Sequence, residues 1–201
     1  MRIVSAQELE SWLASGRILE KDARGPKVVA LPGGQFLKIF HTRRHPILAR
    51  LQPAARRFTR NIERLRQLDI PAPDVTELFW LDRASGLSGC LYQPLPGESV
   101  EQLYRRQPQA LVDLLPALAD FIRRLHRQGV YFRSLHLGNI ILLPDGSFGL
   151  IDTLDLQFKN HPLNAWQIKR NFQHLEHYLI RHRIADFPLP ELRRLYIQTP
   201  A

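Results

Sequence analysis

The most informative segment of the chain reads Arg133-Ser134-Leu135-His136-Leu137-Gly138-Asn139-Ile140-Ile141-Leu142, with Leu150-Ile151-Asp152 following at a short distance. Two apolar runs on either side of Pro144-Asp145-Gly146 predict two strands joined by a tight turn. Asn139 comes just before this predicted hairpin, and Asp152 comes just after it. Carboxamide and carboxylate oxygens are hard ligands of the type that Mg²⁺ prefers. We therefore expect Asn139 and Asp152 to hold a metal ion against phosphate groups.

A long amphipathic helix is predicted just before this segment. Apolar residues recur at three- and four-residue spacing from Leu111 to Gln128, and Gly129 supplies the C-cap. Three further helices are predicted in this half of the chain, over Glu98–Arg106, Ala165–His182 and Pro190–Tyr196. The second half of the chain is therefore expected to be rich in helix.

The first half of the chain predicts a small antiparallel sheet with one inserted helix. Two short apolar runs flank Pro32-Gly33-Gly34 and predict a hairpin. Two more strands are expected in the runs that begin at Val75 and Gly89. Between the two pairs of strands, an amphipathic helix with an arginine-rich outer face is predicted from about Ile47 to Leu68.

The segment Ser134-Leu135-His136-Leu137-Gly138-Asn139 resembles the D-L-H-x-G-N catalytic loop of bacterial kinase-like small-molecule phosphotransferases. It is most similar to the lipopolysaccharide core kinases, meaning the Kdo and heptose kinases and their relatives known as toluene tolerance proteins. The likeness extends from about Lys27 to Tyr178. It implies an α+β, protein-kinase-like, two-lobed fold with a small antiparallel N-lobe sheet, one N-lobe helix and a reduced helical C-lobe.

This resemblance implies a single kinase-like domain over residues 1–201. We expect the N-lobe over about residues 20–96 and the C-lobe over about 97–201. Ser5 and Glu8 have the spacing of a capping box, so a helix over about residues 5–14 is expected as an N-terminal appendage.

The resemblance also assigns roles to residues of an ATP site. Asp152 corresponds to the magnesium-binding aspartate of the D-F-G element, although different residues follow it here. Lys38 resembles the strand lysine that contacts the α- and β-phosphates, with Glu63 as its ion-pair partner and Asn61 as the alternative. The turn at Gly33 and Gly34 would cover the phosphates, because backbone amides can approach an anion where no Cβ intervenes.

Ser134 stands where the family's loop carries its catalytic aspartate. A serine hydroxyl can orient a substrate hydroxyl but cannot accept its proton near neutral pH as a carboxylate can. Phosphoryl transfer depends mainly on positioning and charge neutralisation, so catalysis can survive this change. Asp155 is the candidate replacement for the base or for a second metal ligand. The alternative is a pseudokinase that binds nucleotide without turnover.

The histidines in this half of the chain are expected to have structural rather than catalytic or metal-binding roles. His136 is expected to brace the loop backbone rather than to act as a general base. His174 and His177 share the three-residue spacing of one helix face but lack an evident third ligand, so a solvated face is favoured over a zinc site. The resemblance also implies that Arg170 and Asn171 on the same predicted helix brace the segment around Asp152.

Composition restricts the partners and the location of the protein. The formal net charge of +9 favours anionic partners such as nucleotides, phosphorylated sugars, nucleic acid or an acidic membrane face. No recognition helix or aromatic platform is evident, so nucleic acid is not expected as a partner. No apolar run reaches the length of a membrane span, and the N-terminus lacks a secretory pattern. The single cysteine, Cys90, is expected to be buried.

Together these features predict a cytoplasmic, ATP- and Mg²⁺-dependent kinase-like phosphotransferase. The resemblance implies transfer to a sugar hydroxyl of the lipopolysaccharide core or of a related anionic, lipid-linked saccharide. Such an acceptor would bring the protein into peripheral contact with the cytoplasmic face of the inner membrane. The pseudokinase, as a nucleotide-binding or regulatory module, remains the alternative function.

Overall fold

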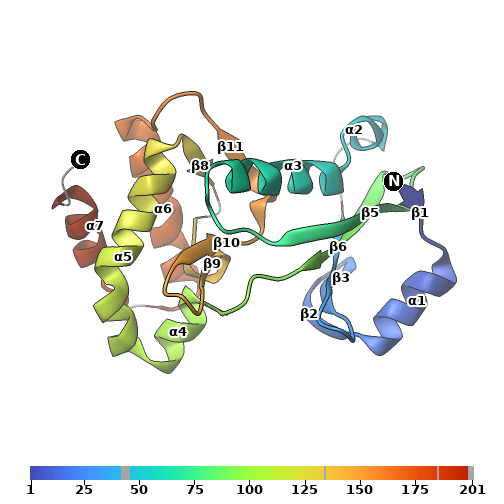
Figure 1. Ribbon diagram of the computed structural model, residues 1–201, viewed down its shortest axis with the longest axis horizontal. Helices are drawn as coiled ribbons and strands as arrows, with labels where there is room; N and C mark the ends of the chain where they lie inside the picture. The colour runs from blue at the N-terminus through green and yellow to red at the C-terminus, as the bar shows by residue number, and fades with distance from the viewer. Residues whose placement is uncertain (42–45, 134, 185, 199–201) are drawn as a thin grey trace. The chain divides into compact units, whose positions relative to one another are not determined.

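The computed structural model describes residues 1–41, 46–133, 135–184 and 186–198. The chain forms two compact units (Figure 1). Unit 1 contains Met1–Gln67 and Ala72–Leu95, and unit 2 contains Leu68–Pro71 and Pro96–Ala201. Within the described ranges, no helix has the combination of length and hydrophobicity that a membrane-spanning segment requires.

Unit 1 is built on a six-stranded sheet in the part of the chain that the structure describes. Its strands occur in the spatial order β1-β5-β6-β4-β3-β2, with β1 parallel to β5 and every other pair antiparallel. The elements of unit 1 are β1 (Arg2–Ile3), α1 (Ala6–Ser15), β2 (Arg17–Asp22), β3 (Gly25–Ala30), β4 (Phe36–Phe40), α2 (Pro46–Leu51), α3 (Ala54–Gln67), β5 (Asp74–Asp82) and β6 (Leu87–Gln93). The predicted hairpin is formed by β3 and β4, and β5 pairs with β6 as the second predicted pair of strands.

One face of this sheet packs against α1. Side chains alternate between the two faces of a strand, and Leu37 and Ile39 of β4 point into the apolar core on the α1 side. Trp12 of α1 packs on the same core, with its ring centroid 5.3 Å from that of Phe79. The helix expected as an N-terminal appendage is therefore part of the packing of unit 1.

The helix predicted from Ile47 to Leu68 forms two helices instead of one. α2 ends at Leu51 and α3 begins at Ala54, with Pro53 between them. Proline lacks the N–H that an uninterrupted helix needs and its ring clashes with the preceding turn. The carbonyl of Pro53 accepts a hydrogen bond from Arg57 N–H, so the proline lies at the start of α3.

Unit 2 combines helices with two small sheets. β10, β9 and β7 form a three-stranded antiparallel sheet, and β11 pairs with β8. The elements of unit 2 are β7 (Glu98–Ser99), α4 (Val100–Arg106), α5 (Pro108–Arg127), β8 (Val130–Phe132), the 3₁₀ turn η1 (Leu137–Asn139), β9 (Ile140–Leu142), β10 (Phe148–Leu150), the 3₁₀ turn η2 (Thr153–Asp155), β11 (Leu156–Phe158), α6 (Ala165–Arg181) and α7 (Leu189–Gln198). The predicted helices and the predicted hairpin are present with boundaries within a few residues of those expected.

The short segment Leu68–Pro71 is held in unit 2 by hydrogen bonds to its backbone. The guanidinium of Arg124 on α5 donates to the carbonyls of Leu68 and Asp69, at 3.0 and 2.8 Å. The N–H of Leu150 on β10 donates to the Pro71 carbonyl at 2.9 Å. These bonds explain why this segment is part of unit 2 although the residues before and after it belong to unit 1.

A buried polar network joins the three long helices of unit 2. His126 of α5 contacts the Tyr196 hydroxyl of α7 through Nδ1 at 2.9 Å and the Asn171 carboxamide oxygen of α6 through Nε2 at 3.1 Å. Because that oxygen can only accept, Nε2 carries the proton and Nδ1 accepts from Tyr196. Asn171 in turn donates to the backbone carbonyl of Phe132 at 3.0 Å. The network therefore fixes the end of β8 to all three helices.

The network predicts acid-sensitive stability. Burial lowers the pKa of His126 from 6.5 to about 4. Between these two pH values the unfolded chain binds a proton that the folded chain does not, so the free energy of unfolding falls as the pH falls from about 6.5 to about 4. A shift of this size corresponds to roughly 3 kcal/mol. Urea unfolding at several pH values measures this loss.

A His126→Leu variant tests the assignment. It should be less stable than the parent at pH 7, because Asn171 and Tyr196 lose a buried partner, by roughly 2–4 kcal/mol. The difference should shrink as the pH is lowered, because the variant has no imidazole to protonate. His161→Leu, at an exposed position, is the control and should cost less than about 0.5 kcal/mol. A constant difference between parent and His126→Leu across this range would contradict the assignment.

Candidate functional site

The β9–β10 hairpin brings Asn139 and Asp152 together. Ile140 faces Leu150 across the antiparallel pair, and the next N–H along, from Ile151, donates to the Asn139 carbonyl at 3.0 Å. Asp152 directly follows Ile151 in the chain. The two oxygen-bearing side chains that the sequence predicts for a metal site therefore start from adjacent points of one hairpin.

Asp152 has an unusual backbone conformation. Its φ and ψ of 52° and 55° place it in the left-handed region, which most L-residues avoid and which aspartate tolerates better than most. It caps the N-terminus of η2, and Thr153 after it is fully buried. Non-glycine residues in this conformation often occur at functional sites, where the surrounding structure compensates the conformational cost.

Pairing of β8 with β11 holds the two ends of the segment that carries Asn139 and Asp152. Phe132 at the end of β8 faces Leu156 at the start of β11. Asn171 was expected to support the segment around Asp152. It donates instead to the Phe132 carbonyl and so supports the beginning of the loop. Ser134, the residue at the predicted catalytic position, lies outside the described residues.

His136 contacts Asn139 directly and determines its orientation. The Asn139 Nδ2 donates to His136 Nε2 at 3.0 Å, so the carboxamide oxygen points away from the imidazole. Burial lowers the pKa of His136 to about 4, although the carboxylate of Asp152 acts in the opposite direction. His136 is thus a neutral acceptor near pH 7. These contacts fit the bracing role expected for this histidine.

A stack of rings holds His136 in place. The Tyr178 ring of α6 lies parallel to the imidazole with a centroid distance of 4.1 Å, and His182 stacks on the other side of Tyr178 at 4.0 Å. The Tyr178 hydroxyl donates to the carboxylate of Glu101 on α4. Burial and this hydrogen bond raise the pKa of Tyr178. The loop of Asn139 is therefore supported by side chains from both α4 and α6.

Gly138 is required by the closeness of this support. A Cβ at this position would lie 3.0 Å from the Tyr178 hydroxyl oxygen and 3.2 Å from a carboxylate oxygen of Glu101. Both distances are tighter than ordinary van der Waals contacts, so any larger residue would displace the tyrosine or the carboxylate. The glycine of the sequence motif thus has a packing reason.

Lys38 occupies the α3 side of the sheet in unit 1. It pairs with Val28 on β3 and Cys90 on β6, so its strand is flanked on both sides. Its ammonium lies 5.3 Å from the Phe58 ring centroid on α3, a cation–π distance. Cys90 is fully buried as expected, and burial raises the pKa of its thiol to about 12. Lys38 is thus a cation held by a rigid strand and an aromatic ring.

The structure favours Asn61 over Glu63 as the α3 residue on the side of Lys38. Asn61 is 8% exposed and belongs to the buried face of α3, one turn after Phe58. Glu63 lies on the exposed face. Residues two positions apart on a helix point in different directions, so Asn61 and Glu63 face different sides of α3. Among the described residues, Glu63 takes part in none of the ion pairs. Asn61, the alternative partner of Lys38, is thus the one of the two on the buried face of α3.

Gly33 and Gly34 form the turn between β3 and β4. Their φ angles of 89° and 87° lie in the region that favours glycine. The turn is closed by hydrogen bonds from Leu31 N–H to the Gln35 carbonyl and from Gly34 N–H to the Leu31 carbonyl. Both glycines are exposed, and a Cβ on either would meet no atom within 4 Å. The predicted turn is therefore present, and its positive φ angles rather than close packing explain the two glycines.

The oxygen donors on the hairpin fit a magnesium ion of the kind that phosphate substrates carry. Mg²⁺ usually takes one or two protein oxygens, several waters and the phosphates of its substrate. In the described part of the chain, no group of three or more His, Cys, Asp or Glu residues is arranged to hold a metal. A site based on Asn139 and Asp152 therefore suits an ion that arrives with phosphate groups and not a closed structural metal site.

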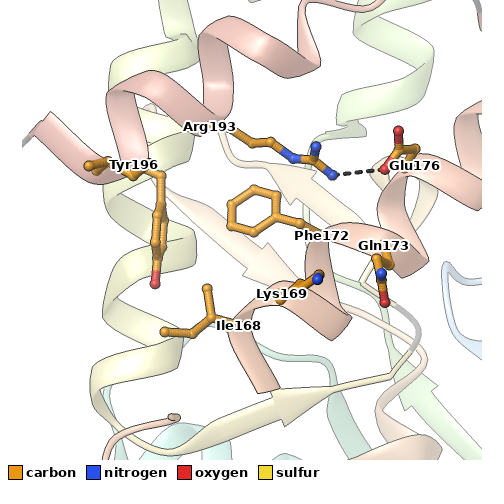
Figure 2. A pocket seen from close by; sticks show the side chains of 8 residues that line it. Ile168, Lys169, Phe172, Gln173, Glu176, Arg193 and Tyr196 are labelled. Carbon is orange, nitrogen blue, oxygen red and sulfur yellow. Dashed lines mark hydrogen bonds and ion pairs between the residues drawn. The ribbon is translucent and has the colours of Figure 1, made fainter. Parts of the chain in front are cut away.

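Unit 2 also has an apolar cavity of about 380 Å³ between α6 and α7. Figure 2 shows Phe172 at its centre, with Tyr196 and Ile168 beside it and Arg193 paired with Glu176 above it. No predicted site residue lines this cavity. The cavity is therefore separate from the candidate site.

The support of the loop could not be found from the sequence. Tyr178 and Glu101 are far apart in the chain, and neither shows a local motif that pairs them. His126 looks like one more basic residue at a helix end, yet it is buried and binds Asn171. The only local signal was Gly138, whose small size indicates a close approach.

Comparisons with known proteins found one family match and similar solved structures. Residues 31–133, slightly more than half of the chain, match the family described as "APH: Phosphotransferase enzyme family". Among solved structures, the chain is similar to a kinase of Cydia pomonella granulovirus, PK-1, with 13% identity and a TM-score of 0.44. The likeness covers 79% of this chain and 58% of that kinase. No curated protein sequence matches. The predicted α+β, protein-kinase-like fold is confirmed.

A double-mutant cycle tests the loop support. Gly138→Ala should cost about 1–3 kcal/mol, because its Cβ meets the Tyr178 hydroxyl. Tyr178→Phe should cost about 1–3 kcal/mol, because Glu101 loses a donor. In the double variant, the nearest obstacle to the new methyl group is gone. Urea unfolding should therefore reveal a coupling of at least about 0.5 kcal/mol, and strictly additive costs would refute this packing.

Proposed function

Because the chain belongs to the phosphotransferase enzyme family (APH), we propose that it transfers the γ-phosphoryl group of ATP, with Mg²⁺, to a hydroxyl group of its acceptor. One observation carries the proposal: the hairpin register places Asn139 beside the residue that precedes Asp152. Carboxamide and carboxylate oxygens are ligands of the hard type that a phosphate-bound magnesium ion prefers.

Each residue has a defined part in the proposed reaction. Asp152 and Asn139 would hold the magnesium ion, which neutralises charge on the phosphates when it is bound. His136 would keep the Asn139 oxygen directed away from the imidazole by accepting the hydrogen bond of the Asn139 Nδ2. Lys38 would act as a point charge for the α- and β-phosphates, and the turn at Gly33 and Gly34 would cover the phosphates with backbone amides.

We further propose that the acceptor is a sugar hydroxyl of the lipopolysaccharide core or of a related lipid-linked saccharide. The likeness of the loop Ser134–Asn139 to that of the lipopolysaccharide core kinases supports this, as does the net charge of +9. An anionic, membrane-bound acceptor would place the protein in peripheral contact with the cytoplasmic face of the inner membrane. In this proposal residues 1–201 act as one kinase-like domain.

A pseudokinase is the second candidate, and Ser134 is the observation that favours it. Without a carboxylate at this position, a substrate hydroxyl has no base of suitable pKa beside it, unless Asp155 takes that role. Asp155 is exposed and lies at the end of η2, three residues after Asp152. Such a protein would bind ATP with Mg²⁺ and regulate a partner without turnover.

Binding of ATP with Mg²⁺ should raise the thermal stability of the parent protein. A ligand at 100 times its dissociation constant stabilises by about 2.7 kcal/mol, which is roughly 5–10 °C in Tm for a chain of this size. Asp152→Ala should abolish the shift, and Lys38→Met should reduce it. Asp113→Ala removes an exposed carboxylate from α5 and should keep the shift. An unaffected shift in Asp152→Ala, or none in the parent, would refute the site.

Restoring the carboxylate in the loop separates the enzyme from the pseudokinase. If Ser134 has replaced a catalytic base, Ser134→Asp should increase phosphate release from ATP at least roughly tenfold, since general bases contribute 10²–10⁴-fold. Ser11→Asp on the exposed surface of α1 adds the same charge and should change nothing. If the parent turns over ATP and Ser134→Asp does not increase the rate, this position does not supply the catalytic base.

A further inference from the structure

Two adjoining cavities in unit 2 are lined in part by residues of α6. Their volumes are about 300 and 290 Å³. Arg133 and His174 line both cavities, so the two together form one groove, which we call the basic groove. Arg181 lines its first half, and Arg170 and Lys159 line its second half.

The basic groove has an excess of positive charge. No aspartate or glutamate lines either cavity, and within the described residues no carboxylate forms an ion pair with Arg133, Arg170 or Arg181. Burial lowers the pKa of His174, and the charges of Arg170, Arg133 and His177 lower it further. The groove thus disfavours one more proton on His174. A bound anion would relieve this repulsion.

Nearby carboxylates are already occupied by other partners. Glu101 accepts hydrogen bonds from Tyr178 and Arg105, and although burial raises its pKa, these bonds lower it overall. Glu176 of α6 pairs with Arg193 of α7 at 2.9 Å. Neither pairs with an arginine of the basic groove. The carboxylate of Asp152 acts on His136, but Asp152 does not line the groove.

The second half of the groove contains an exposed aromatic ring. Trp166, at the start of α6, is 67% exposed and lines the cavity together with Gln157 and Gln167. Lys159 donates to the Gln157 carboxamide oxygen at 3.1 Å. A flat apolar ring surrounded by carboxamides and cations suits a sugar ring, whose C–H face packs on the indole while its hydroxyls reach polar groups.

The first half of the groove adjoins the loop of the candidate site. Leu135 and His136 line it, and His136 receives the hydrogen bond from Asn139. Arg133 immediately precedes Ser134 in the sequence. A ligand in the groove therefore contacts the same loop that carries the proposed metal ligand.

We propose that the basic groove binds a phosphorylated saccharide, with Trp166 packed against the sugar ring and with Arg133 and Arg181 holding the phosphate. The inference rests on the proposed transfer to a saccharide hydroxyl and narrows its substrate class. The acceptor then already carries a phosphate group, so another phosphotransfer reaction precedes this one. A cationic acceptor is repelled by the same charges.

Isothermal titration calorimetry with three probes tests the proposal on the full chain at constant ionic strength. The probes are glucose 6-phosphate, inorganic phosphate and glucose, each without nucleotide. Glucose 6-phosphate should bind roughly tenfold more tightly than inorganic phosphate, because it engages both halves of the groove. Glucose should bind more weakly than glucose 6-phosphate by at least the same factor. Equal affinity for glucose 6-phosphate and phosphate overturns the role of Trp166.

Two variants separate the halves of the groove. Arg181→Gln should weaken both phosphate-containing probes roughly tenfold, since a charge-assisted hydrogen bond is lost. Trp166→Ala should weaken glucose 6-phosphate and leave inorganic phosphate unchanged. Arg127→Gln, which removes an exposed arginine of α5 that lines neither cavity, is the control of equal charge. The same loss in Arg127→Gln as in Arg181→Gln would reduce the effect to net charge and overturn the groove.

The remaining outcomes distinguish this proposal from the proposed function. The thermal shift with ATP and Mg²⁺ is measured on the same Arg181→Gln and Trp166→Ala proteins and should persist in both. A normal shift with no binding of glucose 6-phosphate sinks the groove and leaves the phosphotransferase standing. Binding of glucose 6-phosphate without a thermal shift by ATP and Mg²⁺ supports the groove and refutes the proposed nucleotide site. Single-stranded DNA that displaces glucose 6-phosphate and binds more tightly would assign the groove to nucleic acid instead.

Discussion

The hydrogen bond from the Ile151 N–H to the Asn139 carbonyl is the constraint on which the candidate site depends. In an antiparallel pair, a register shift of one residue turns every side chain to the opposite face. Here the turn at Asp145–Ser147 and the pairing of Ile140 with Leu150 leave one register, and that register places Asp152 one residue beyond the partner of Asn139. The chemistry proposed for the protein therefore starts from backbone geometry.

Side chains then convert this backbone placement into orientation. His136 fixes which end of the Asn139 carboxamide is presented, and Tyr178 fixes His136 by stacking on it. In unit 1 the same principle holds with different groups, because Lys38 lies against the ring of Phe58 while its strand is paired on both sides. In both units, side chains of the candidate site are supported by aromatic rings, an arrangement that restricts their motion.

The sequence predicted the parts that depend on local patterns. Both hairpins and the long helices follow from apolar spacing and turn residues, and the register of the second hairpin places Asn139 beside the residue before Asp152. It did not predict β8 and β11, since three-residue strands are too short to show a period, and it extended one helix through Pro53. The sequence could not decide whether Asn61 or Glu63 lies on the side of Lys38, because packing determines which face of α3 is buried. The basic groove is assembled from β8 and the loop after it, from β11 and from α6, and it has no sequence signature.

The segment Leu68–Pro71 has a consequence for how the protein is made. Its partners in unit 2 are Arg124 of α5 and Leu150 of β10, both much later in the chain. On the ribosome, this segment emerges long before those partners exist, so its carbonyls must stay hydrated while α3 and the rest of unit 1 are already available to fold. Unit 2 is complete only when its C-terminal part has bound the segment Leu68–Pro71. The assembly of unit 2 is therefore the later event in biosynthesis.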